Sequence, residues 1–140
     1  MIHSIETQMK RVKKALMDAL NKLSPVPCFL DRAPSKEPFP YAVVCRMSIT
    51  TLDEGHLATF DLELHTDETL EGAAEKLEDL CDLFRSRIEQ MLITDGETFS
   101  AHANYESERA AGEAEFDLTH RTLAFTLRIF HYEQIGRIGR

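Results

Sequence analysis

The stretch from Leu57 to Leu92 changes from one hydrophobic period to another, and this change limits the folds open to the chain. In residues 57–66 apolar and polar side chains alternate, which is typical of a strand with one buried and one solvated face. The polar residues 66–69 can cap a helix, and the apolar residues after them recur at helical spacing. This helix would be about 35 Å long, enough to cross a small sheet. Its apolar face comprises Leu70, Ala73, Ala74, Leu77, Leu80, Cys81, Phe84, Ile88, Met91 and Leu92.

The segment before this stretch predicts a helix, an edge strand and a long strand. An apolar stripe over residues 1–23 indicates an amphipathic helix, which Pro25 ends. Pro27 limits the apolar run 26–31 to a sheet edge, and three prolines make 32–40 an extended loop. Residues 41–52 alternate as a strand, and a short turn at 53–56 joins them to the next strand as an antiparallel hairpin. The alternation places Tyr41, Val43, Cys45, Met47 and Ile49 on one face, and Ala42, Val44, Arg46, Ser48 and Thr50 on the other.

Two strands are expected after the long helix, which Asp95 and Gly96 should end. Residues 98–107 and 118–132 both alternate between apolar and polar side chains, and the acidic segment 108–117 connects them. We therefore predict a single α+β domain over residues 1–140, with residues 133–140 as a flexible tail. The domain should have a mainly antiparallel sheet with two long amphipathic helices packed on one face.

The composition excludes several classes of protein. A domain of 140 residues can bury enough surface to fold without metal or disulfide. Cys28, Cys45 and Cys81 lie in apolar stretches without C-x-x-C spacing, so we expect buried, reduced thiols. The chain shows neither an apolar run long enough to span a membrane nor an N-terminal signal core, so we expect no membrane partner and no export.

Charge is distributed unevenly along the chain, whose net charge is −8. Residues 1–23 carry five basic and two acidic side chains, whereas residues 53–119 carry four basic and nineteen acidic ones. Nucleic-acid binding needs clustered Lys and Arg, so we expect no specific nucleic-acid binding.

The acidic residues suggest one candidate surface. On the long helix, several carboxylates lie four residues apart, where like charges repel by a few tenths of a kcal/mol per pair. Such a face is either ordinary solvated surface or a docking surface for basic residues of a second subunit or another partner. The candidate partner or lumen surface comprises Glu71, Glu75, Glu78, Asp79, Asp82, Glu106, Glu108, Glu113 and Glu115.

The sequence offers little for catalysis or metal binding. None of the six histidines has the H-x-x-x-H or H-E-x-x-H spacing of a metal site, and no nucleophile or phosphate-binding motif occurs. Asp61, Glu63 and His65 share one strand face, which a hard metal or an acid–base pair could use. The solvated side of any amphipathic strand shows the same alternation. We therefore expect no cofactor, no metal and no enzymatic activity.

The order of elements resembles that of the tail terminator (tail completion) proteins of long-tailed bacteriophages. The resemblance covers most of the chain as a diffuse pattern rather than as an invariant motif. It is carried by residues 19–23 at the end of the first helix, 38–44 leading from the loop into a strand, 60–66 passing into 71–92, and 121–129 near the C-terminus.

The resemblance implies a non-catalytic protein that forms a homohexameric ring. Such a ring caps the tail tube, ends its polymerisation and provides the surface that joins the head. The implied partners are copies of the chain, the tail tube protein and a head-completion or connector protein, while DNA passes through an acidic lumen. The implied location is the head-proximal end of the virion tail, after assembly in the bacterial cytoplasm. Strand edges could supply the contacts between subunits.

One alternative function follows from the charge pattern alone. A small cytoplasmic α+β adaptor without enzymatic activity could use the same acidic surface to bind a basic partner. Charge reversal at Glu75 and Asp79 would then abolish partner binding and leave ring assembly unaffected.

Overall fold

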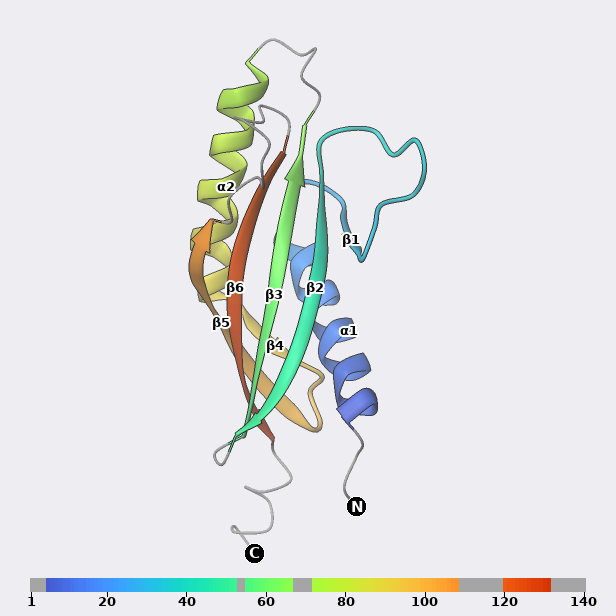
Figure 1. The fold of residues 1–140 in the computed structure, drawn as a ribbon, viewed down its shortest axis with the longest axis vertical. Coiled ribbons are helices and arrows are strands. Elements are labelled where there is room, and N and C mark those ends of the chain that lie inside the picture. Colours follow the sequence, from blue (N-terminus) through green and yellow to red (C-terminus); the bar gives the residue numbers. More distant parts are fainter. Residues whose placement is uncertain (1–4, 53–54, 67–71, 109–119, 132–140) are drawn as a thin grey trace, which may run out of the picture.

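The computed structural model describes residues 5–52, 55–66, 72–108 and 120–131 (Figure 1). These residues form an α+β fold, as the sequence predicts. The elements, in chain order, are α1 (Ile5–Leu23), β1 (Cys28–Leu30), β2 (Tyr41–Leu52), β3 (Gly55–His65), α2 (Ala73–Gln90), β4 (Leu92–Thr94), β5 (Phe99–Glu108) and β6 (His120–His131).

The six described strands form one sheet in the order β1-β2-β3-β6-β5-β4. Strand β1 pairs in parallel with β2, and the other four pairings are antiparallel. Strand β6 therefore lies between β3 and β5, so that the C-terminal strand occupies the middle of the sheet. This arrangement brings the start of β6 beside the end of β3, where His120 pairs with His65.

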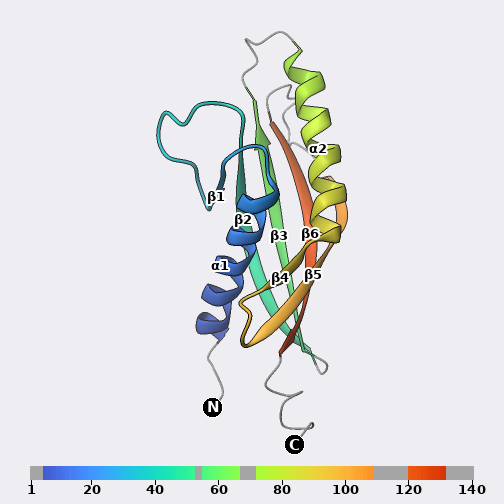
Figure 2. The ribbon, with the colours of Figure 1, turned by 180° about the vertical axis from the view of Figure 1, so that it is seen from behind.

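Both helices lie on the same side of the sheet, behind it in Figure 1 and in front of it in Figure 2. Helix α1 packs against both edge strands, β1 and β4, and the sheet curves around it. Helix α2 packs against β3, β5 and β6. The core between these layers contains four fully buried phenylalanines and the buried stripes of both helices: Phe60, Phe84, Phe99, Phe125, Val12, Leu16, Leu20, Leu77, Cys81 and Ile88.

The outer edge of β1 is occupied by a side chain of α1. The amide of Asn21 accepts a hydrogen bond from the backbone nitrogen of Cys28 at 3.2 Å and donates one to the Cys28 carbonyl oxygen at 3.4 Å. Asn21 thus bonds the backbone groups that a neighbouring strand would use. The backbone nitrogen and oxygen of Cys28 are therefore already bonded on the side away from β2.

The long helix ends earlier than its apolar pattern predicts. Helix α2 stops at Gln90, and Met91 has an extended backbone at φ −83° and ψ 132°. The next three residues form β4, which pairs with β5 and leaves Leu92 54% exposed and Ile93 buried. The prediction that Leu92 belongs to the buried helical face is wrong, because from Met91 the pattern of burial has a period of two.

The predicted start of this helix also shifts. Its first residue is Ala73, and its N-cap is Gly72 at φ 74°, a left-handed conformation that glycine tolerates. Among the residues that the structure describes, no side chain caps this end by a hydrogen bond. The proposed cap at 66–69 lies mostly outside the described residues.

A β-bulge in β2 changes which face its side chains occupy. Cys45 pairs with Asp61, but Ser48 pairs with Thr59, so two residues of β2 face one residue of β3. Arg46 adopts φ 52° within this bulge. Val43 and Cys45 therefore share the face of Ser48, whereas Met47 and Ile49 pack against the core with Ala42 and Val44. The predicted uniform alternation over 41–52 is wrong, because one extra residue reverses every later side chain.

Candidate functional site

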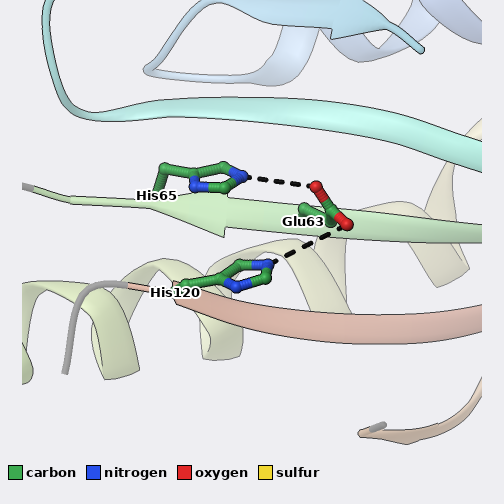
Figure 3. A group of neighbouring side chains, drawn as sticks. All are labelled: Glu63, His65 and His120. Carbon is green, nitrogen blue, oxygen red and sulfur yellow. Dashed lines mark hydrogen bonds and ion pairs between the residues drawn. The ribbon is translucent and has the colours of Figure 1, made fainter. Parts of the chain in front are cut away.

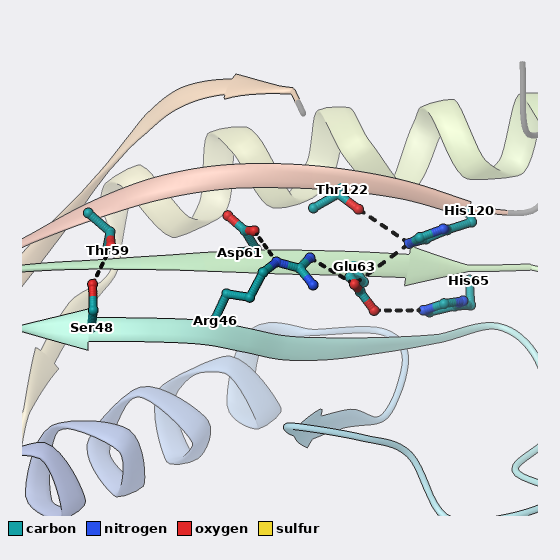
Figure 4. Close-up of polar contacts among 8 residues, drawn as sticks. All are labelled: Arg46, Ser48, Thr59, Asp61, Glu63, His65, His120 and Thr122. Atoms are coloured by element: carbon teal, nitrogen blue, oxygen red, sulfur yellow. Dashed lines mark hydrogen bonds and ion pairs between the residues drawn. The ribbon is translucent and has the colours of Figure 1, made fainter. Parts of the chain in front are cut away.

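The sheet face directed away from the helices carries a row of polar side chains, and we call this side the open face. Its central residues come from β2, β3 and β6, which pair in register (Figure 4). Their exposure varies: Arg46 and Ser48 are exposed, whereas Asp61 is only 1% exposed although no described helix covers it. The row comprises Arg46, Ser48, Thr59, Asp61, Glu63, His65, His120 and Thr122.

Arg46 joins two carboxylates of the neighbouring strand. Its Nε donates to Asp61 Oδ2 at 2.5 Å, and its Nη2 donates to Glu63 Oε2 at 2.8 Å. The β-bulge makes this possible, because without the extra residue Arg46 would point towards the helices like Val44. A buried carboxylate such as Asp61 requires such a partner, since an unpaired buried charge is costly.

Glu63 also faces two imidazoles, one from its own strand and one from β6 (Figure 3). His65 Nε2 lies 3.4 Å from Glu63 Oε1, and His120 Nε2 lies 3.9 Å from Glu63 Oε2. One nitrogen or oxygen atom of each residue can be chosen so that all three lie within 4.8 Å of one another. Among the described residues this is the group whose geometry suits a metal ion. A three-residue cluster of this kind can also exchange protons between the carboxylate and the imidazoles.

The two imidazoles belong to a stack of rings on the open face. The rings of His65 and His120 are nearly parallel, with centroids 4.5 Å apart. Tyr41 stacks on the other side of His65 at 4.9 Å, and Phe39 stacks on Tyr41 at 5.3 Å. The stack therefore places the two imidazoles side by side, with their Nε2 atoms near Glu63.

The surroundings keep Glu63 ionised and the nearby thiol protonated. Burial raises the pKa of Glu63, but hydrogen bonds from Arg46 and His65 outweigh it, so the pKa lies below its usual value. Burial, and then the negative charge of Glu63, raise the pKa of Cys45 to about 12. At neutral pH the cluster therefore contains a carboxylate ligand, while Cys45 is a poor nucleophile.

The structure brings the three candidate residues of β3 to one place and adds two that the sequence analysis missed. Asp61, Glu63 and His65 share the open face, as their alternation predicts. Arg46 was missed because the bulge is not visible in the pattern. His120 was missed because it is distant in sequence. Pairing the predicted strands 57–66 and 118–132 in register would have found it.

The described residues of the candidate acidic surface lie in several surroundings. Glu75, Glu78 and Asp79 are exposed on α2, and Asp82 on the same helix forms an ion pair with Arg85. Glu108 pairs with Arg121, whose charge also interacts with that of Glu78.

Glu106 accepts a hydrogen bond from Thr126 on the open face, away from the helix. Glu71, Glu113 and Glu115 lie outside the described residues.

The comparisons with known proteins give no family. The sequence matches no known family, and no curated protein is significantly similar to it. Among the described residues, no helix has the length and apolar character needed to cross a membrane. The fold and site define a small α+β protein with a polar, histidine-containing open face, and any function must be argued from that surface.

Proposed function

We propose that this chain is a structural subunit that assembles head-to-tail with copies of itself into a ring, of the kind that caps a phage tail tube. The support comes from the open face, which carries exposed apolar side chains at two separate places. Phe39 is 46% exposed beside Tyr41, near the β1 side of the sheet. Leu92 and Phe130 are 54% and 41% exposed on β4 and β6, the two strands that flank β5.

Two separate apolar contact regions on one chain are compatible with the geometry of a ring. In a closed ring each subunit uses one surface to contact the next subunit and a different surface to contact the previous one. Aromatic side chains such as Phe39 and Phe130 are enriched at protein contact surfaces. A mainly antiparallel sheet with both long helices on one side agrees with this role, because the other side is left for contacts. Capping of a tube, the hexameric number, and contacts with tube and connector proteins are further parts of the proposal.

The head-to-tail arrangement makes a specific prediction for mixed variants. Phe39→Lys should disable one contact surface, and Leu92→Lys with Phe130→Ser should disable the other. Each variant alone should stay monomeric, because every contact needs both surfaces. An equimolar mixture should form a heterodimer and nothing larger, since one intact pair of surfaces remains. Analytical ultracentrifugation would measure these masses.

Thr50→Lys, an exposed position on the open face, is the matched control and should assemble like the wild type. A wild-type chain that is monomeric at high concentration, even with tube protein present, would contradict ring assembly. Tube capping has its own readout: adding the ring to polymerising tube protein should shorten the tubes seen by electron microscopy.

The exposed carboxylates of α2 favour the adaptor as a second candidate. Glu75, Glu78 and Asp79 lie together on the outer side of the helix, where a basic partner could bind. Reversing the charge at Glu75 and Asp79 should abolish partner binding without affecting ring assembly. Unchanged partner binding in that variant would count against the adaptor.

A further inference from the structure

We propose that Glu63, His65 and His120 bind one divalent transition-metal ion of the zinc class on the open face. The three residues come from adjoining positions of two paired strands, so their backbones are held by the sheet. Their side chains converge from the same side (Figure 3). This site is separate from the ring proposal and does not depend on it.

The distances are close to those that a zinc ion requires. Zinc binds histidine nitrogen and carboxylate oxygen at about 2.0–2.2 Å, so neighbouring ligand atoms of a tetrahedral site are about 3.4 Å apart. His65 Nε2 lies 3.4 Å from Glu63 Oε1, and His120 Nε2 lies 3.9 Å from the other oxygen, Oε2. One ligand atom from each of the three residues lies within 4.8 Å of the other two. Small side-chain movements would therefore complete the site. Two nitrogen ligands favour zinc, cobalt, nickel or copper over magnesium or calcium, which prefer oxygen.

The main movement is a rotation of the two imidazoles. Their planes are nearly parallel, at an angle of 7°, so both nitrogens can point at one ion only if the rings turn towards each other. This rotation is inexpensive, because the second side-chain torsion of histidine has a broad energy minimum. His65 would lose part of its stacking with Tyr41, which makes tyrosine fluorescence a reporter of binding.

The surrounding groups leave a net negative charge for a cation. Arg46 bonds both Asp61 and Glu63, so one guanidinium faces two carboxylates. These three groups together carry one net negative charge, which attracts a divalent ion. Arg46 also orients the Glu63 carboxylate, as hydrogen-bonding partners of metal ligands commonly do. The hydroxyl of Thr122, 3.2 Å from His120 Nε2, competes with the ion for that nitrogen.

Three protein ligands define an open site rather than a closed structural one. Structural zinc sites usually have four protein ligands, whereas sites with three leave a position for water or another ligand. Cys45 does not belong to the set of converging ligand atoms. The ion would therefore have one or more exchangeable positions on the open face, while it links the end of β3 to the start of β6.

The test is calorimetric titration of the untagged chain with zinc chloride, because an added histidine tag would itself bind zinc. We expect one zinc ion per chain. Glu63→Gln, His65→Ala and His120→Ala should each weaken zinc binding at least tenfold, since each removes a ligand. Substitution of cobalt for zinc should give a visible absorption spectrum that the three variants lose.

His102→Ala is the matched control, because His102 is an exposed histidine on β5 outside the cluster. It should bind zinc like the wild type. Circular dichroism would establish that each variant is folded, and Glu63→Gln preserves the shape of the side chain if an alanine variant unfolds. The proposal is overturned if the wild type shows no saturable zinc binding. It is also overturned if the three ligand variants bind no more weakly than His102→Ala.

Discussion

Arg46 shows how a single residue can organise a sheet surface. It lies in a β-bulge at φ 52°. This left-handed backbone conformation is energetically unfavourable for any residue with a side chain, arginine included. In return its guanidinium reaches the open face and bonds Asp61 and Glu63. This conformation therefore gives Asp61, which is only 1% exposed, a positively charged partner.

Replacing Arg46 should destabilise the protein through Asp61 rather than through Arg46 itself. Arg46→Met removes two charge-assisted hydrogen bonds from carboxylates, and we expect a loss of about 2 kcal/mol in the free energy of unfolding. Urea denaturation would measure it. Adding Asp61→Asn to Arg46→Met should recover part of the loss, because the buried charge is gone. If the loss of stability in the double variant equals the sum of the losses in the two single variants, Arg46 and Asp61 are not coupled.

At the scale of elements, the connection from β4 to β5 depends on one carboxylate. Asp95 accepts hydrogen bonds from the backbone nitrogens of Glu97, Thr98 and Phe99, and from the Thr98 hydroxyl. Burial raises the pKa of Asp95, but these bonds outweigh it and lower the pKa to about 2. The carboxylate closes the turn that holds the three-residue strand β4 against β5.

The lowered pKa predicts how the stability of this turn depends on pH. A carboxyl group with a folded pKa near 2, below its ordinary 3.8, stabilises the fold above the higher value. That contribution is lost as the pH falls towards about 2. Asp95→Asn should therefore be less stable than the wild type by roughly 1 kcal/mol at neutral pH, where exposure to solvent limits the effect. Urea denaturation at several pH values should show the difference shrinking in acid, and a constant difference would contradict this assignment.

Most elements follow from local patterns, and the exceptions have identifiable causes. Alternation alone locates β2 at 41–52 and places Leu123 and Phe125 in the core, because each strand has one buried face. The bulge at Arg46 escapes prediction because it depends on pairing with β3 rather than on local sequence. Strand β4 was not predicted because its three residues lie almost directly after α2 and continue the apolar spacing of that helix. Two of the three residues of the cluster, Glu63 and His65, could be predicted because they share a strand, whereas His120 reaches them only through the pairing of β3 with β6.

At the scale of the whole molecule, the three cysteines lie in different parts of one packed structure. Cys81 faces the core from α2, Cys28 lies on the edge strand β1, and Cys45 lies beneath the polar row of the open face. All three are free and buried, and their burial confirms the prediction from the sequence. Burial raises the pKa of each thiol, to about 11 for Cys81 and about 12 for Cys45.

The thiols should therefore report on opening of the fold. In the native protein at mildly alkaline pH, a thiol-specific reagent should label the three cysteines slowly, because each is buried and protonated. In denaturant all three should react rapidly. Labelling followed by mass spectrometry would measure the rate at each position. Rapid labelling of one native cysteine would show that its part of the structure opens independently of the rest.

The bond between Asn21 and Cys28 has a consequence for the fate of the chain in the cell. An open strand edge is a template for amyloid-like stacking. Here the side chain of Asn21, on α1, occupies the edge of β1 at Cys28. Proteolytic loss of that helix would expose the edge together with the core face that the helix covers. At this edge, protection of the Cys28 backbone from pairing with another strand thus depends on α1.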